Sequence, residues 1–135
     1  MLYLLDTNVC VMYMNGRSQL VRDRVLSTPT NEMAVCSVVK AELFYGSMRS
    51  SNPARSLERQ QGFLSRFVSL PFDDEAALLF GQVRSQLDRQ GTPIGSYDLQ
   101  IAAIALTHNL TLITHNTAEF NRVDGLLLED WEIEA

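Results

Sequence analysis

The chain has 135 residues, of which 46% are hydrophobic and 20% are charged, and its formal net charge is −5. These values are typical of one globular domain, expected to span residues 1–135, and they exclude a disordered or coiled-coil chain. The apolar runs are only a few residues long, so we expect no transmembrane helix, no secretory signal, no membrane partner and a cytoplasmic protein.

The first half of the chain is expected to contain three strands and four helices. Residues 3–6 predict a buried strand, and residues 8–14 predict a helix that Asn15-Gly16 ends, because glycine is common just past a helix C-terminus. The elements expected after them are a helix from 18 to about 26, a strand at 33–37, a helix at 38–48, a helix that Pro53 opens and a strand at 68–70.

The second half begins with a long helix. It has acids in its first turn, at residues 73–75, and Gly91 is expected to end it. Its predicted apolar face comprises Ala77, Leu78, Phe80, Gly81, Val83 and Leu87. Next come a helix at 97–108, a strand at 110–114, a loop with a short helical turn at 115–121 and a strand at 126–129. Helices between strands at this rhythm predict an α/β fold with a parallel sheet and helices on both of its faces.

Asp6 directly follows the first predicted strand. Leu4 and Leu5 suit a central parallel strand, and ligands of open α/β sheets bind outside the carboxyl ends of such strands. Asp6 is therefore expected in a binding crevice. The alternative interpretation is that Asp6 caps the following helix. We expect Thr7 and Asn8 to take that capping role, which leaves the Asp6 carboxylate free.

Four acids share one position relative to the predicted elements, since each lies where a strand has just ended or a helix has just begun. They are Asp6, Glu42, Asp98 and Glu119. In a parallel sheet they can converge on one edge, where repulsion between their charges favours a bound cation. Carboxylate oxygens suit Mg²⁺ or Mn²⁺. Such an ion activates water and offsets charge on a phosphodiester, which is the chemistry of a metal-dependent nuclease.

Each of these residues also has an ordinary structural interpretation. Glu42 and Glu119 can be solvated surface acids, Asp98 can answer the dipole of its own helix, and Asn116 can be a turn residue. The cysteines and histidines lack the spacing of a zinc site, and we expect two reduced core thiols and two non-catalytic imidazoles; they are Cys10, Cys36, His108 and His115.

Arginines at 49, 55, 59 and 66 fall in one stretch of the chain. Arginine favours bidentate contacts with phosphate or carboxylate groups, so this stretch can serve RNA or an acidic partner. The alternative is a solvated helix face.

The most distinctive motifs are Leu5-Asp6-Thr7-Asn8 and the segments 37–46, 93–103, 112–120 and 128–131. In their order and spacing they resemble the PIN-domain ribonuclease toxins of VapBC toxin–antitoxin pairs, over essentially the whole chain. The resemblance implies a single PIN domain, an α/β/α sandwich with a central five-stranded parallel sheet. It also implies that the first strand is central and neighbours the fourth.

The resemblance carries roles over to particular residues. Asp6 and Asp98 match the principal metal-binding aspartates, and Glu42 matches the glutamate that completes the site. Where many PIN domains have an aspartate after the fourth strand, this chain has Asn116 and then Glu119. We infer that Glu119 acts through a water or a second metal. The supporting residues, expected to orient the site through hydrogen bonds, are Thr7, Asn8 and Asn116.

The implied function is a toxin that is a Mg²⁺-dependent endoribonuclease, with Mn²⁺ as an alternative, cleaving tRNA or a structured RNA loop. The implied partners are a second copy in a homodimer and a VapB-like antitoxin, which can send an arginine toward the acidic pocket, with the complex bound to operator DNA. Two other hypotheses fit the acids: a phosphatase-like hydrolase of small phosphoesters, and a non-catalytic protein that docks an antitoxin-like partner.

Overall fold

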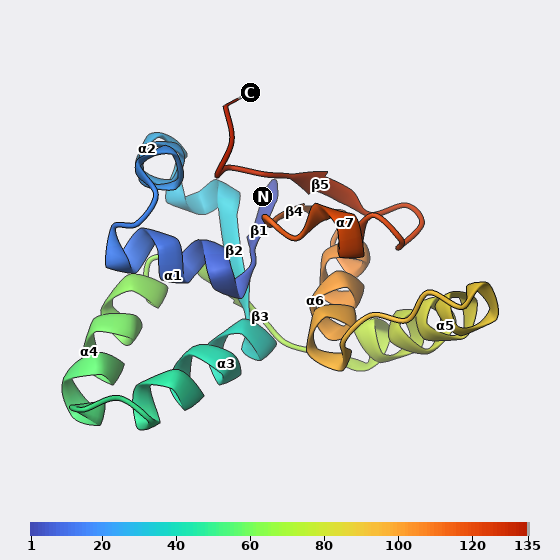
Figure 1. The fold of residues 1–135 in the computed structure, drawn as a ribbon, viewed down its shortest axis with the longest axis horizontal. Helices are drawn as coiled ribbons and strands as arrows, with labels where there is room; N and C mark the ends of the chain where they lie inside the picture. Colours follow the sequence, from blue (N-terminus) through green and yellow to red (C-terminus); the bar gives the residue numbers. More distant parts are fainter. Residues whose placement is uncertain (135) are drawn as a thin grey trace.

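The computed structural model describes residues 1–134. Five strands pair in parallel into one sheet with the order β3-β2-β1-β4-β5 (Figure 1). Their bounds are β1 (Tyr3–Leu5), β2 (Met33–Cys36), β3 (Val68–Leu70), β4 (Thr111–Ile113) and β5 (Leu127–Glu129). This confirms the predicted α/β/α fold, with β1 central and beside β4.

Seven α-helices connect and cover these strands within the described residues. They are α1 (Thr7–Asn15), α2 (Gln19–Ser27), α3 (Ser37–Met48), α4 (Pro53–Leu64), α5 (Asp74–Gln90), α6 (Ser96–Thr107) and α7 (Thr117–Phe120). A 3₁₀ turn at Thr30–Glu32, which the sequence did not predict, leads into β2. In Figure 1, α1 to α4 lie on one side of β1 and β2, and α5 and α6 lie on the other. None of the helices described is long and apolar enough to cross a membrane.

Local chemistry sets the helix ends as predicted. The Ser18 hydroxyl accepts the Val21 N–H at 3.2 Å at the start of α2, and the Asp73 carboxylate accepts the Ala76 N–H at 3.0 Å at the start of α5. Gly16 and Gly91 close α1 and α5 in the left-handed conformation, each with φ 69°, which glycine adopts without steric cost.

The core lies along the central strands. Leu4 and Leu5 of β1 are fully buried, as a strand covered by helices on both faces requires. Helix α6 contacts α3, α5 and β4, and residues 101–105 of it are all buried, so α6 has no polar stripe. Cys10 and Cys36 are buried free thiols, which confirms their predicted place in the core.

The predicted apolar face of α5 was partly wrong. Ala77, Leu78 and Gly81 are exposed, and Leu78 has 66% of its surface accessible. The face that packs on α6 is rotated, because residues three or four apart must share one side of a helix. Its buried members are Ala76, Val83 and Leu87, with Leu79 and Phe80 partly buried.

Substitutions of Gly81 in α5 and of Gly91 just after it are expected to change the stability in opposite directions. Gly81 lies inside the helix with open space around its Cα, so Gly81→Ala is expected to raise the free energy of unfolding by about 0.5–1 kcal/mol. Gly91 directly follows α5 and has φ +69°, a conformation that alanine adopts only with strain. Gly91→Ala is therefore expected to lower the free energy of unfolding by about 1–2 kcal/mol, although an added Cβ would meet no neighbouring atom. Urea unfolding of both variants measures the difference. Equal effects would show that the left-handed end of α5 is not maintained in solution.

Candidate active site

Three helices begin at the carboxyl edge of the sheet. Helices α1 and α3 follow β1 and β2 directly, and α3 contacts both α1 and α6 (Figure 1). The chain passes from β1 to β2 on one side, while β4 pairs with the opposite side of β1. The crevice at this reversal of strand order is where open α/β sheets bind ligands.

Asp6 lies at this crevice, with only 5% of its surface exposed. Its Oδ1 accepts the Thr7 N–H at 2.8 Å, and its Oδ2 accepts the Thr114 hydroxyl at 2.8 Å. Burial raises the pKa of Asp6, against the lowering effect of the Thr114 and Thr7 hydrogen bonds, and nearby Glu42 raises it further. Each carboxylate oxygen retains acceptor capacity for another ligand.

The expectation that Thr7 and Asn8 would replace Asp6 as the cap is wrong. Asp6 is itself the N-cap of α1, through the bond from the Thr7 N–H. Asn8 is exposed, and its side chain has no part in the hydrogen bonds that connect the acids of the described chain. Asp6 can therefore cap α1 and also lie in the crevice, because its Oδ1 accepts from Thr7 and its Oδ2 accepts from Thr114.

Glu42 joins Asp6 through Thr7. It lies on α3, half-buried, and its Oε1 accepts the Thr7 hydroxyl at 2.9 Å. Thr7 thus uses its backbone N–H toward one acid and its side chain toward another. Thr7 thereby connects the start of α1 with the second turn of α3.

Asp98 completes the central group from the first turn of α6. Desolvation raises its pKa to about 6, and the charges of Asp6, Glu119 and Glu42 add to the rise. Asp98 therefore lies within electrostatic reach of the other three acids, as expected from their places at the ends of strands and the starts of helices.

Glu119 has a different environment. Its Oε2 accepts the Asn116 side-chain N–H at 2.9 Å, and its Oε1 accepts the Gly95 backbone N–H at 3.0 Å. These donors, Asn116 first, lower the pKa of Glu119. Gly95 caps α6, so Glu119 ties α7 to the turn that presents Asp98. Asn116 thus restrains Glu119 through this hydrogen bond.

Thr114 is a site residue that the sequence analysis missed. It is fully buried, its hydroxyl donates to Asp6, and its oxygen accepts the Asn116 N–H at 3.0 Å. The signal was available in principle, because β1 and β4 are neighbours in register from Leu5 to Ile113, which places the next residues, Asp6 and Thr114, side by side.

No salt bridge of residues 1–134 joins any of the four acids to a basic side chain, and Arg122 acts on Glu119 only through its nearby charge. Within residues 1–134 the ion pairs are formed by other acids, namely Glu32, Glu129, Asp130 and Glu132. Buried carboxylates without a basic partner favour a cation, and a donor set made of oxygen atoms fits Mg²⁺ or Mn²⁺.

The four acids are more widely spaced than a compact metal cage. In the described part of the chain, ligand atoms that all lie within 4.8 Å of one another occur instead at His115, Asp130 and Glu132. That group is an ion-paired surface cluster, with His115 Nδ1 at 2.9 Å from Asp130 and 3.7 Å from Glu132. The wider spacing in the crevice suits Mg²⁺, which usually keeps several waters and takes only one or two carboxylates directly.

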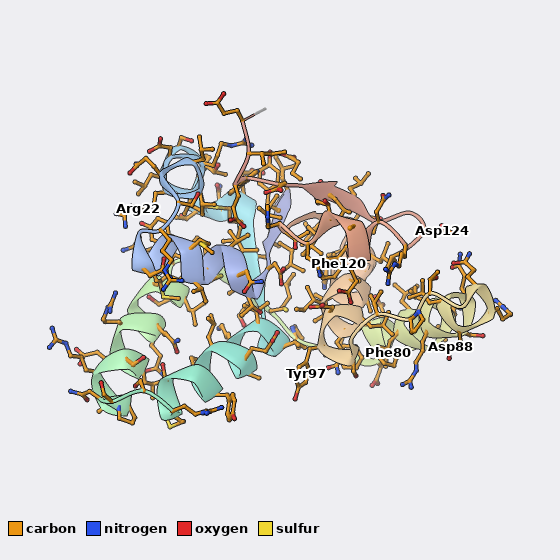
Figure 2. All side chains as sticks on the ribbon, in the orientation of Figure 1. Arg22, Phe80, Asp88, Tyr97, Phe120 and Asp124 are labelled. Atoms are coloured by element: carbon orange, nitrogen blue, oxygen red, sulfur yellow. The ribbon has the colours of Figure 1, made fainter. Side chains whose placement is uncertain are left out.

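The arginine stretch divides into two parts. Arg49 stays near α3, where its guanidinium lies 5.6 Å from the centroid of the Tyr45 ring. A groove of about 530 Å³ between α1, α2 and α4 is lined by the other three arginines of the stretch, Arg55, Arg59 and Arg66. Arg22 of α2, labelled in Figure 2, also lines this groove. This groove lies at the C-terminal end of α1, whereas Asp6 lies at its N-terminal end.

Comparison with known proteins gives consistent matches over nearly the whole chain. The model of the PIN domain family matches residues 3–126. The tRNA(fMet)-specific endonuclease VapC of Salmonella typhimurium is 39% identical over 129 residues, which cover 96% of this chain and 97% of that protein. The protein of the same name from Shigella flexneri is 41% identical with the same coverage.

A solved structure agrees with these matches. A chain in the crystal structure of DNA-bound VapBC from Salmonella typhimurium has a TM-score of 0.91 to this chain and 39% identity, covering 97% of this chain and 99% of its own.

The raised pKa of Asp98 predicts how stability depends on pH. Because the folded-state pKa of about 6 exceeds the ordinary value of 3.8, the stabilising contribution of Asp98 is fully present below about pH 4 and is lost as pH rises through 6. In EDTA at neutral pH, Asp98→Asn is expected to be more stable than the parent by about 1 kcal/mol, because Asp98 is partly exposed and solvent screens its charge. The difference should vanish in acid, as measured by urea unfolding from pH 4 to 8.

Glu119→Gln is the matched control with the opposite sign. Its hydrogen bonds lower the pKa of Glu119, so the ionised form stabilises the fold at neutral pH and this contribution is lost as pH falls. Glu119→Gln should therefore be less stable than the parent at neutral pH. A stability gain of Asp98→Asn that persists unchanged at pH 4 would contradict the raised pKa.

Proposed function

Because the chain belongs to the PIN-domain family, among its VapC ribonucleases, we propose that it hydrolyses RNA with a divalent cation held by Asp6 and Asp98. The observation that carries the proposal is the acidic cluster at the switch point, with a buried Asp6 and no basic residue of the described chain paired to it. Mg²⁺ is the proposed cation and Mn²⁺ the alternative, because the donors are carboxylate oxygens.

The bound cation would lower the pKa of a water and offset the charge that builds on the phosphodiester. Other residues of the chain hold in place the acids that would bind this cation. Thr114 and Thr7 hold Asp6 in one orientation, Thr7 also fixes Glu42, and Glu119 fixes the turn before Asp98 through the Gly95 N–H. The water oxygen joins the phosphorus as the ribose oxygen leaves with a proton, without a covalent enzyme intermediate.

A tRNA is the proposed substrate, since relatives 39% and 41% identical to this chain are named tRNA(fMet)-specific endonucleases. Sequence-specific proteins generally read RNA at unpaired loops, where the base edges are free. An open crevice at the edge of a sheet suits such a loop.

A VapB-like antitoxin is the proposed inhibitor, since the neighbouring solved structure is a VapBC complex bound to DNA. An arginine of the antitoxin would satisfy the same carboxylates as the cation. We also propose a homodimer, assembly with the antitoxin on operator DNA, a cytoplasmic location and a single domain over residues 1–135. The groove between α1, α2 and α4, with its four arginines, is a candidate surface for an acidic segment of the antitoxin.

Removing either principal aspartate should abolish cleavage. Asp6→Asn and Asp98→Asn are each expected to reduce cleavage of unfractionated tRNA by more than the roughly 10- to 100-fold that loss of an indirect metal contact costs. EDTA should stop the parent, and Mg²⁺ or Mn²⁺ should restore it. Gel analysis and sequencing of the RNA ends measure both the rate and the position of cleavage.

Asp74→Asn is the control, because Asp74 is an exposed acid in the first turn of α5. It should cleave at the parental rate. Parental activity of Asp98→Asn in Mg²⁺, or undiminished cleavage after thorough chelation, would show that the proposed metal site is wrong.

Metal affinity should separate direct ligands from orienting residues. By calorimetry with Mn²⁺, Asp98→Asn is expected to lose far more affinity than Glu119→Gln, because Asp98 is a proposed direct ligand whereas Glu119 anchors the Gly95 turn that precedes it. Thr114→Val should weaken binding about 10- to 100-fold, because Asp6 loses a donor that orients it.

The control for Thr114→Val is Thr107→Val, whose hydroxyl bonds only to the Ala103 carbonyl within α6. It should bind Mn²⁺ as the parent does. Equal losses for Glu119→Gln and Asp98→Asn would instead make Glu119 a direct ligand.

A further inference from the structure

Two exposed tyrosines lie beside the acidic cluster. Tyr45 on α3 and Tyr97 on α6 have 63% and 61% of their surfaces accessible. Figure 2 shows Tyr97 at the N-terminal end of α6, directed away from the ribbon. One exposed ring is unremarkable on a protein surface, whereas two rings from separate helices that face one hollow need a physical explanation.

The hollow is a cavity of about 380 Å³ lined by Ala41, Glu42, Tyr45 and Tyr97. Glu42 belongs to the acidic cluster through its hydrogen bond with Thr7, and Tyr97 directly precedes Asp98. The cavity therefore adjoins the candidate active site, with which it shares Glu42. Its volume is within the range of small-ligand pockets, and its walls combine aromatic faces with a single acid.

Neither tyrosine ring packs against another ring. Within residues 1–134 the aromatic pairs are Tyr3–Trp131, Tyr13–Phe63, Phe63–Phe67 and Phe72–Phe80. Both rings therefore remain available to a planar ligand.

Arg49 supports one of these rings. Its Nη1 donates to the Tyr45 hydroxyl at 3.2 Å, and its guanidinium lies 5.6 Å from the ring centroid. This contact restrains Tyr45 and brings a positive charge to its side of the cavity. An anionic group next to a bound planar ligand would meet that charge.

Resting on the proposed ribonuclease activity, we infer that Tyr45 and Tyr97 stack an unpaired base of the RNA beside the scissile phosphate, while Arg49 contacts the adjoining backbone. Aromatic rings bind any base through its π face, and a neighbouring arginine adds backbone attraction, which is how proteins hold single strands. Bases in a duplex are already stacked, so this subsite selects loops and ends.

Kinetics with unfractionated tRNA tests the inference. Tyr45→Ala and Tyr97→Ala are each expected to raise KM about 5- to 100-fold, the range that loss of one stacked base produces, with a smaller change in kcat. Tyr→Phe at either position should stay within about twofold of the parent because the ring is retained. Tyr→Leu should remain impaired, since it keeps apolar volume without an aromatic face.

A protection experiment gives a readout independent of turnover. In the Asp98→Asn background, which keeps the RNA intact, saturating tRNA should protect Tyr45 and Tyr97 from nitration by tetranitromethane, as measured by peptide mass analysis. Leu26→Ala is the matched kinetic control, because Leu26 on α2 has 64% of its surface exposed and lies outside the cavity. It should keep the parental KM.

Three outcomes would overturn the stacking site: parental KM in both alanine variants, leucine variants as active as the phenylalanine variants, or undiminished nitration with tRNA bound.

Light scattering after size exclusion tests whether a second copy of the chain occupies this surface instead of RNA. If Tyr45→Ala or Tyr97→Ala turns a dimer into a monomer, the rings serve self-association instead. Failure of the unmodified protein to cleave any tRNA would contradict the proposed function, and is seen before any variant is made.

Discussion

The hydrogen bond between the Thr114 hydroxyl and the Asp6 carboxylate is the contact on which the site depends. It joins the ends of two parallel strands that are distant in sequence, and it supplies a donor to a carboxylate removed from water. Burial alone would favour the protonated acid. Two donors, from Thr7 and Thr114, oppose that effect without adding positive charge. These two hydrogen bonds thus favour the ionised form of Asp6, which is the form that a cation binds.

The remaining acids gather around that charge because of topology. With β1 central, the helices that follow β1 and β2 and the start of α6 all open toward one crevice. Desolvation, with repulsion from the other acids added to it, raises the pKa of Asp98 and opposes folding at neutral pH. A ligand that neutralises the group stabilises the folded state in proportion to its affinity. Glu119 differs because the Asn116 and Gly95 donors make it a structural anchor as well as an acid.

Local signals were sufficient to predict most of the fold. Ser18, Asp73, Gly16 and Gly91 mark helix ends through backbone chemistry that does not depend on the rest of the molecule. Convergence of the acids followed from the parallel sheet alone. The role of Thr114 depends on which strands are neighbours, and the face of α5 depends on how α6 packs against it. These are tertiary facts that periodicity cannot supply.

The crevice combines an acidic half with an aromatic half, and this combination fits the proposed binding of RNA and the proposed inhibition by an antitoxin. The acidic half repels the phosphate groups of RNA until a cation is bound. On this side of the crevice, RNA binding and RNA cleavage would therefore both require the cation. Tyr45 and Tyr97 provide contacts that do not depend on charge, which allows a chain with a net charge of −5 to hold a polyanion. In the proposed inhibition, a guanidinium that enters the acidic half would replace the cation, and RNA held by the aromatic half would then not be cleaved. Such inhibition would need no change in the fold, because the arginine would use the same carboxylates as the cation.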